Sequence, residues 1–499
     1  MTQRTKSPYI LMALMLLMSL VLAACGNTGG GGTEGGGTEG GGTTGATATA
    51  TGTGGVGGEA TGAPAILEQT TSEPGVVTEG ATAGATPGAT GVATAAATGT
   101  ATGAQGGSTT GAAAGAGGNN DTSKGELLIY ASLPLSGPSR GQTLSTVNGM
   151  KLALEESGGA AGGYKIRFEA LDDSTAAAQA WTPEQEAANA NKAVRDKASV
   201  YLATFNSGAA AVSIPIMNRA GIPMISPANT AIDLTKKGAN PALLASLYKA
   251  GERNYFRVVP NDAYQGPADA DFAKELGAQK VYVLHDQQTY GLGIAEAFRT
   301  RAQQIGLDVV GFEGIDVKAG SFSGLMEKVV DSGAQLVFFG GLTDTKGPQL
   351  VKDLRELASN DKVKFLGPDG ILDTGFIEAA GEAAEGAYGT VASAPPEKLT
   401  GSGAEFYKKY QERFGQKPEA YAIFGYDAMG VALAAIDKAE SKDPKDILKA
   451  LKNLGEYSGA LGTFSFDKDG DTTLKQMNAY QVKNGEWVWI RSLGVGADS

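Results

Sequence analysis

Histidine and cysteine are nearly absent: the 499 residues include one of each, His285 and Cys25. A single cysteine excludes a disulfide framework within the chain. One histidine leaves little material for general acid–base catalysis, and His285 is expected only to end a strand. The sequence also lacks a G-x-S-x-G elbow, a phosphate-binding loop and a free catalytic thiol. These absences argue against an enzyme, and we expect no cofactor and no metal site.

Basic side chains are scarce as well. The formal net charge is −12, and residues 26–122 contain no lysine or arginine. No basic face and no basic run interleaved with aromatic residues is present, so nucleic acid is not an expected partner. Residues 26–122 are instead almost entirely glycine, threonine and alanine. Such a segment cannot bury enough apolar surface to offset the entropy lost on ordering, which predicts a disordered tether over residues 25–122.

The N-terminus has the features of an export signal. Two basic residues precede an apolar segment, residues 10–22, that is too short to be a stable membrane span. The segment Leu22–Cys25 (LAAC) resembles the lipobox of bacterial lipoproteins. This resemblance implies removal of residues 1–24 and attachment of a lipid to Cys25, which would anchor the chain on the extracytoplasmic face of the cell membrane. The alternative is an ordinary signal peptide with an incidental cysteine.

From Glu126 onward, strand and helix patterns alternate. Short segments of strand type are followed by segments in which apolar residues recur at helical spacing. The alternation forms two runs, one before and one after Tyr255–Val259, and each run predicts a doubly wound, mostly parallel sheet flanked by helices. Residues 401–454 are mainly helical, and residues 462–490 return to strand patterns. The predicted fold is α/β, with two lobes whose strand C-termini face a shared cleft.

One stretch, Ser207–Thr230, places polar residues at the ends of two predicted strands. Val200–Phe205 and Pro223–Ser226 are typical of strands, and Ser207 is a suitable N-cap for a helix between them. Parallel neighbours would bring Ser207 and Thr230 to the same sheet edge, where open α/β sheets bind ligands. The helix N-terminus there favours an anion such as a carboxylate. The alternative is that Ser207 caps the helix and does nothing more.

Six motifs of the folded part occur in a characteristic order. They are Leu133–Gly137 (LPLSG), Ile225–Thr230 (ISPANT), Tyr255–Pro267 (YFRVVPNDAYQGP), His285–Gly293 (HDQQTYGLG), Leu336–Gly341 (LVFFGG) and Phe365–Gly370 (FLGPDG). In this order and spacing they resemble the type I periplasmic-binding-protein family, specifically the leucine–isoleucine–valine-binding proteins of ABC importers. The resemblance covers about residues 126–490.

This resemblance implies a two-lobed clamp with an amino acid held between the lobes. It implies three hinge crossings, near Arg257–Pro260, Tyr388–Ala392 and Glu456–Leu461. The implied boundaries are residues 123–258 with 389–455 for the first lobe, and residues 259–388 with 456–499 for the second.

The resemblance also implies roles for site residues. Ser207 and Thr230 would hold the α-carboxylate and assist with the α-ammonium group, and the Ala228 carbonyl would accept from the ammonium. Tyr290 would line the site from the second lobe, and Asp369 would pair with the ammonium. Taken alone, Thr230 and Asp369 are also common turn residues, and Tyr290 is equally compatible with packing.

Two positions depart from the family pattern. Arg140 stands where amino-acid binders usually have an aromatic residue beside the side-chain pocket, and Leu342 stands where a tyrosine often reaches the carboxylate. An inward guanidinium would favour a ligand tail with a carboxylate or amide. A guanidinium in solvent would leave only its stem at the pocket and favour leucine, isoleucine or valine. We favour the second arrangement because arginine is rarely buried unpaired.

The expected function is that of the solute-binding component of an ABC importer, which passes a branched-chain or related amino acid to membrane permease subunits. The same clamp would serve a tethered ligand sensor, or a binder of an amide or another polar, amino-acid-like solute. The sequence does not separate these functions. One further motif, Asp467–Asp471 (DKDGD), lacks the spacing of an EF-hand calcium loop and is expected to form a hairpin turn.

Overall fold

The computed structural model describes residues 112–113, 121–238, 240–395 and 398–494. All of these residues belong to one unit, Thr102–Ser499. The predicted signal at residues 1–24, the lipidation site Cys25 and nearly all of the predicted tether at 25–122 therefore lie outside the described residues. Across the described ranges, no helix combines the length and the apolar character needed to cross a membrane.

Lobe 1 is built on a six-stranded sheet in the order β3-β4-β2-β7-β8-β9, in which only the β3–β4 pair is antiparallel. Its strands are β2 (Glu126–Leu133), β3 (Ala160–Ala161), β4 (Tyr164–Asp172), β7 (Val200–Ala203), β8 (Met224–Ser226) and β9 (Tyr255–Arg257). The hairpin β5 (Ser174–Thr175) and β6 (Ala180–Trp181) follows β4. The helices are α2 (Arg140–Glu156), α3 (Pro183–Arg195), α4 (Ser207–Ala220), η1 (Ile232–Leu234), α5 (Pro241–Leu247), α11 (Ser402–Phe414), α12 (Ala422–Ala439) and α13 (Pro444–Lys452).

Helices cover both faces of the lobe 1 sheet because side chains alternate along each strand. In β2, Leu128 and Tyr130 belong to the buried cluster formed with α3 and α4. The intervening residues Ile129 and Ala131 belong to the cluster formed with α2 and α12. The sheet therefore lies between two helical layers.

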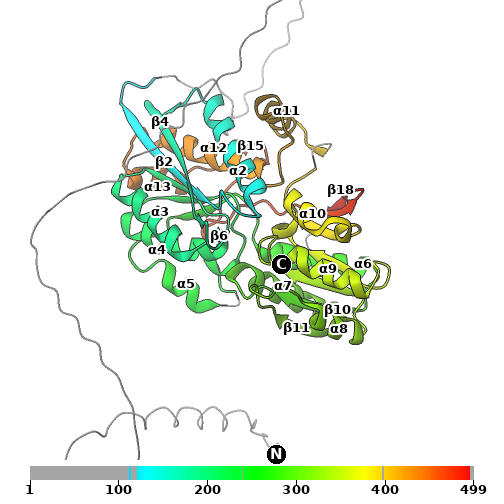
Figure 1. Cartoon of the computed structure of the whole chain (residues 1–499). Helices are drawn as coiled ribbons and strands as arrows, with labels where there is room; N and C mark the ends of the chain where they lie inside the picture. The colour runs from blue at the N-terminus through cyan, green and yellow to red at the C-terminus, as the bar shows by residue number, and fades with distance from the viewer. Residues whose placement is uncertain (1–111, 114–120, 239, 396–397, 495–499) are drawn as a thin grey trace, which may run out of the picture. The chain divides into compact units, whose positions relative to one another are not determined.

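Lobe 2 is built on a seven-stranded sheet in the order β11-β10-β12-β13-β14-β17-β18, in which β17 and β18 are antiparallel additions to a parallel core. Its strands are β10 (Lys280–His285), β11 (Asp308–Gly314), β12 (Leu336–Gly340), β13 (Lys364–Gly367), β14 (Tyr388–Val391), β17 (Met477–Lys483) and β18 (Glu486–Leu493). The helices are α6 (Asp262–Glu275), α7 (Thr289–Gln304), α8 (Ser323–Asp331), α9 (Gly347–Leu357), η2 (Asp369–Ile371), α10 (Thr374–Ala380) and η3 (Gly381–Ala384). Figure 1 shows α7, α8 and α9 gathered beside β10 and β11. The predicted α/β fold with two doubly wound lobes is confirmed.

The chain crosses between the lobes three times, between β9 and α6, between β14 and α11, and between Thr472 and β17. The first two crossings lie at or beside the predicted hinges. The prediction of a third hinge at Glu456–Leu461 is wrong, because this segment packs on lobe 1. There β15 (Tyr457–Gly459) and β16 (Gly462–Phe464) form a small sheet with β1 (Ala112–Ala113), and β15 contacts α12. Lobe 1 thus extends beyond residue 455 to Thr472, and β14 belongs to lobe 2.

A buried ion pair connects the first crossing to the third. Arg257, at the end of β9, is fully buried, and its Nε donates to Asp471 Oδ1 at 2.7 Å. Asn261, within the first crossing, donates to Asp471 Oδ2 at 2.9 Å. The N–H groups of Asp469 and Asp471 both donate to Asp467 Oδ1, so this segment forms the predicted turn. The turn thereby delivers the Asp471 carboxylate to the hinge.

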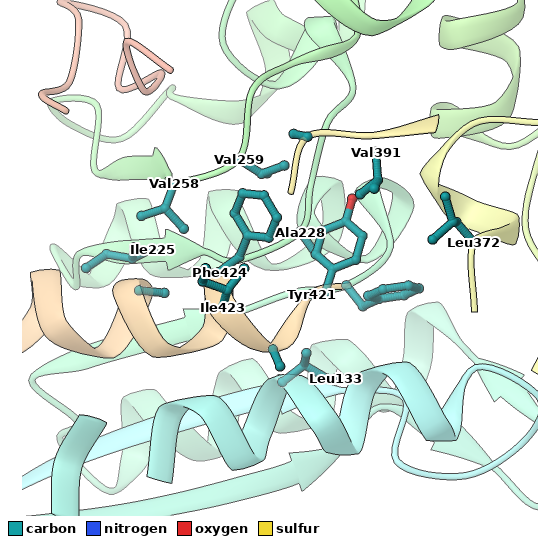
Figure 2. Close-up of a cluster of buried hydrophobic side chains, with 14 of the residues drawn as sticks. Leu133, Ile225, Ala228, Val258, Val259, Leu372, Val391, Tyr421, Ile423 and Phe424 are labelled. Carbon is teal, nitrogen blue, oxygen red and sulfur yellow. The ribbon is translucent and has the colours of Figure 1, made fainter. Parts of the chain in front are cut away.

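The apolar core of lobe 1 continues to the boundary with lobe 2. Figure 2 shows Ile423 and Phe424 of α12 packed beneath the strand ends, with Tyr421 at the start of the helix. The Tyr421 hydroxyl is directed toward Val391 of lobe 2 (Figure 2). Packing therefore fixes the ring and presents its hydroxyl to the other lobe.

Candidate ligand-binding site

A pocket, partly open to solvent, lies between the two lobes. Lobe 1 contributes Phe205, Asn206, Ser207, Gly208, Ala228, Thr230 and Tyr421, and lobe 2 contributes Gln288, Tyr290, Leu342 and Asp369. Most of these residues follow the carboxyl ends of β7, β8, β12 and β13, the sheet edges at which the sequence predicts a ligand site.

Ser207 and Thr230 are positioned by two neighbouring strands. Ser207 is the first residue of α4, shortly after β7, and Thr230 lies in the loop after β8. The N-cap of α4 is Asn206, so the prediction that Ser207 caps the helix is wrong. The Ser207 hydroxyl instead accepts from the Ala231 N–H at 3.3 Å, which holds the Thr230 loop against the start of the helix.

The loop that carries Ala228 is held by side chains below it. Ser226 Oγ accepts from the N–H groups of Ala228 at 3.1 Å and Asn229 at 2.8 Å. Asn229 points away from the pocket and donates from Nδ2 to the Phe205 carbonyl at 2.9 Å. Both strand ends are therefore joined by hydrogen bonds, and the pocket wall on this side is built before any ligand arrives.

Asp369 is the acidic residue of the pocket. It begins η2 directly after β13 and is 5% exposed. Tyr290, in the first turn of α7, donates its hydroxyl to Asp369 Oδ1 at 2.8 Å. Tyr421, from lobe 1, donates its hydroxyl to Asp369 Oδ2 across the cleft. Burial raises the pKa of Asp369, and the hydrogen bonds from Tyr421 and Tyr290 offset part of that rise.

The surroundings of Asp369 are short of positive charge. Two further carboxyl groups, Asp262 and Asp269 of α6, are fully buried, and burial holds the pKa of each well above its usual range. The charge of Asp369 raises both pKa values further. Among the described residues that line the pocket there is no lysine, arginine or histidine. A ligand group with positive charge would therefore be stabilised beside Asp369.

The opposite side of the pocket can take an anion. The first N–H groups of a helix have no partner within the helix, and the helix dipole places partial positive charge there. Ser207 and Gly208 form the start of α4 and line the pocket, and the hydroxyl residue Thr230 lies beside them. The site thus offers donors to a carboxylate at one end and a carboxyl group to a cation at the other.

The structure brings most of the predicted site residues together. Ser207, Ala228, Thr230, Tyr290, Leu342 and Asp369 all line the pocket. The Arg140 side chain is exposed at the first residue of α2, which is the arrangement that we favoured, but its placement beside the pocket is wrong because other residues line the pocket. A solvated guanidinium avoids the cost of burying an unpaired charge.

Sequence reasoning missed three of the lining polar residues, Tyr421, Asn206 and Gln288. Asn206 and Gln288 are adjacent to predicted site segments, so their position after strand ends was the signal that could have identified them. Tyr421 has no such local signal, because it reaches the pocket from the start of a mostly apolar helix of lobe 1.

Comparison with known proteins agrees with this architecture. A family model described as periplasmic binding protein matches residues 131–486. A Leu/Ile/Val-binding protein homolog of Brucella suis is 28% identical over 364 residues, which cover 72% of this chain and 91% of that protein. A leucine binding protein from Thermotoga maritima has a similar structure, with a TM-score of 0.65 at 25% identity over 74% of this chain and 99% of that one. A solute-binding protein of an ABC transporter from R. palustris, in complex with benzoate, has a TM-score of 0.63 at 20% identity over 74% and 98% of the two chains.

Proposed function

The chain belongs to the periplasmic binding protein family, whose members bind solutes and are not enzymes, and from this premise we propose that it captures an amino acid between its lobes and delivers it to an ABC permease. The observation that carries the proposal is Asp369, a buried carboxyl group that accepts hydrogen bonds from two tyrosine hydroxyls in a pocket whose described lining residues include no basic side chain. Burying an ionised carboxylate without a positive partner is costly. An α-ammonium group would supply that partner, while the start of α4 with Ser207 and Thr230 receives the α-carboxylate.

The names of the relatives support an amino acid as the ligand. The Brucella suis relative is called a Leu/Ile/Val-binding protein homolog, and the Thermotoga maritima structure is that of a leucine binding protein. A fold neighbour in complex with benzoate indicates that this architecture also accommodates a ligand without an ammonium group. Asp369 favours the amino acid here, since its ionised carboxylate attracts an ammonium group and repels a second carboxylate.

A panel of the common amino acids tests the proposal. We expect at least one of them to raise the thermal unfolding temperature of the full-length protein, because a ligand at about 100 times its Kd adds about 2.7 kcal/mol of stability. Benzoate serves as the comparison ligand without an ammonium group. Stabilisation by benzoate and by no amino acid would contradict the proposal.

The affinity for an amino acid should fall at low pH. Asp369 must be ionised to pair with an ammonium group, and its pKa is raised by burial in the free protein. The ammonium lowers that pKa again, so binding releases a proton and weakens as the pH drops through the raised value. Tyr421→Phe removes a hydroxyl that stabilises the ionised form, and we expect it to move the loss of affinity to higher pH.

Calorimetric titrations at a series of pH values from acidic to neutral measure this shift. The matched control is Tyr410→Phe, because Tyr410 is a buried tyrosine of lobe 1 whose hydroxyl bonds Ser145 at 2.7 Å, away from the pocket. A Tyr421→Phe profile that coincides with those of the control and the unmodified protein would show that the hydroxyl does not act on Asp369.

We also propose that the protein is lipid-anchored at Cys25 on the extracytoplasmic side of the membrane, with residues 25–122 as the tether. The proposal rests on the lipobox at Leu22–Cys25. Cys25→Ser should release the protein from the membrane fraction, because one diacylated residue with further acylation anchors firmly whereas a bare polypeptide does not. Asn27→Ser, which leaves the lipobox intact, should remain in the membrane fraction. Membrane association that survives Cys25→Ser would refute the anchor.

A further inference from the structure

The pocket contains a buried amide that has no partner. Asn206 lines the pocket and is 4% exposed, and neither its Oδ1 nor its Nδ2 forms a hydrogen bond within the described residues. Asparagine at the N-cap of a helix commonly caps that helix with its side chain. Asn206 is the N-cap of α4, yet its side chain accepts no hydrogen bond from the helix. The amide is therefore buried at a cost and is available to a ligand.

A second amide faces the pocket from lobe 2. Gln288 lines the pocket and is the N-cap of α7, and its side chain likewise caps no N–H group of its helix. The helices α4 and α7 contact each other across the cleft. Two side-chain amides, one from each lobe, thus lie at helix starts that border the pocket, and neither amide caps its own helix.

The proposed binding of an amino acid head group does not use these two amides. The ammonium group takes Asp369 and the Ala228 carbonyl, and the carboxylate takes Ser207, Thr230 and the helix start. Among the described lining residues, Phe205 and Leu342 then remain as large apolar side chains, and Asn206 and Gln288 remain as polar ones. The wall left for the ligand tail is therefore mixed, with two amides beside two apolar side chains.

We infer that the ligand is an amino acid whose side chain ends in a neutral group that both donates and accepts hydrogen bonds, such as a carboxamide or a hydroxyl, and that Asn206 and Gln288 bind this group. The inference rests on the proposed function and narrows its ligand class. A branched aliphatic tail would leave both amide atoms of Asn206 unpaired in a closed site. A carboxylate tail would meet the negative charge of Asp369, and the described residues that line the pocket include no basic side chain to offset it.

Calorimetry with the full-length protein tests the inference. The ligands are glutamine, asparagine and threonine, compared with leucine, valine, glutamate and lysine. We expect at least one of the first three to bind about tenfold or more tightly than leucine, because sites built to hydrogen-bond a polar group reject analogues that lack it. Asn206→Leu should weaken the polar ligand by about tenfold or more and leave leucine unchanged or tighter. Gln288→Met should act in the same direction.

The surface variant Asn191→Leu, on the exposed side of α3, is the matched control and should leave the ranking unchanged. Leucine, valine, glutamate or lysine as the tightest ligand would overturn the inference while leaving the proposed function intact. So would an unchanged glutamine-to-leucine ratio in Asn206→Leu. Should that variant fail to fold, the ranking by the unmodified protein and by Gln288→Met decides. Binding of none of the amino acids would overturn the proposed function as well.

Discussion

Asp471→Ala should lower the free energy of unfolding by about 3–5 kcal/mol, because removing one member of a buried ion pair leaves the other charge uncompensated. Arg257 is fully buried and Asp471 is 3% exposed, and the Arg257 Nε to Asp471 Oδ1 distance is 2.7 Å. The variant would also remove acceptors for Thr235 and Asn261. Denaturant unfolding of the full-length protein measures the loss.

The exposed pair of Lys452 and Glu252 provides the control for this prediction. The distance from Lys452 Nζ to Glu252 Oε2 is 2.6 Å, but the Glu252 side chain is 81% exposed. Glu252→Ala should cost no more than about 1 kcal/mol, as is usual for surface ion pairs. An Asp471→Ala variant as stable as Glu252→Ala would mean that the buried pair does not stabilise the hinge.

The same ion pair has a defined pH dependence. Burial raises the pKa of Asp471, but the charge and hydrogen bond of Arg257, together with Lys236, outweigh burial and lower it to about 2. In the unfolded chain the pKa of an aspartate is about 3.9. The folded-state pKa is the lower one, so the stabilisation is fully present above about pH 4 and is lost as the pH falls toward about 2. The unfolding free energy of Asp471→Ala should be correspondingly less sensitive to pH in that window.

Asp369→Ala should cost about 2–5 kcal/mol of affinity for any amino acid that binds, because the ammonium group would lose its buried, charged partner. Tyr290 and Tyr421 would also lose their acceptor. Calorimetric titration with the tightest amino acid measures the loss. Asp361→Ala, at an exposed position of lobe 2, should bind normally. Near-normal affinity in Asp369→Ala would mean that the ligand carries no ammonium group at this position.

Much of this site could be predicted because its first half is local in sequence. The strand, helix and strand across Ser207–Thr230 are neighbours in the chain, and parallel pairing alone brings their ends together. Tyr290 and Asp369 could be placed only through the resemblance to a family, since nothing in a single sequence specifies which strand ends of two lobes will meet.

The errors have particular physical causes. Tyr421 was missed because it reaches Asp369 from the start of an otherwise apolar helix, by a tertiary contact without a sequence pattern. The assignment of the segment after residue 455 to lobe 2 failed because strand patterns do not reveal which sheet a strand joins. In the structure β15 contacts α12, and the Phe466 ring packs against Phe256 of β9, so this segment belongs to lobe 1 up to Thr472. Arg140 lies in solvent, as we favoured from the cost of burying its charge, but the stem of its side chain does not line the pocket as expected.

The central claim is that the pocket recognises both charges of an amino acid head group. Its most direct test compares the tightest amino acid with the N-acetyl derivative and the carboxamide derivative of that same amino acid, by calorimetry on the full-length protein. The N-acetyl derivative has no ammonium for Asp369, and the carboxamide has no carboxylate for the start of α4. We expect each derivative to lose about 100-fold or more in affinity, as for the loss of a buried charge pair. Binding of either derivative as tightly as the parent amino acid would contradict the account.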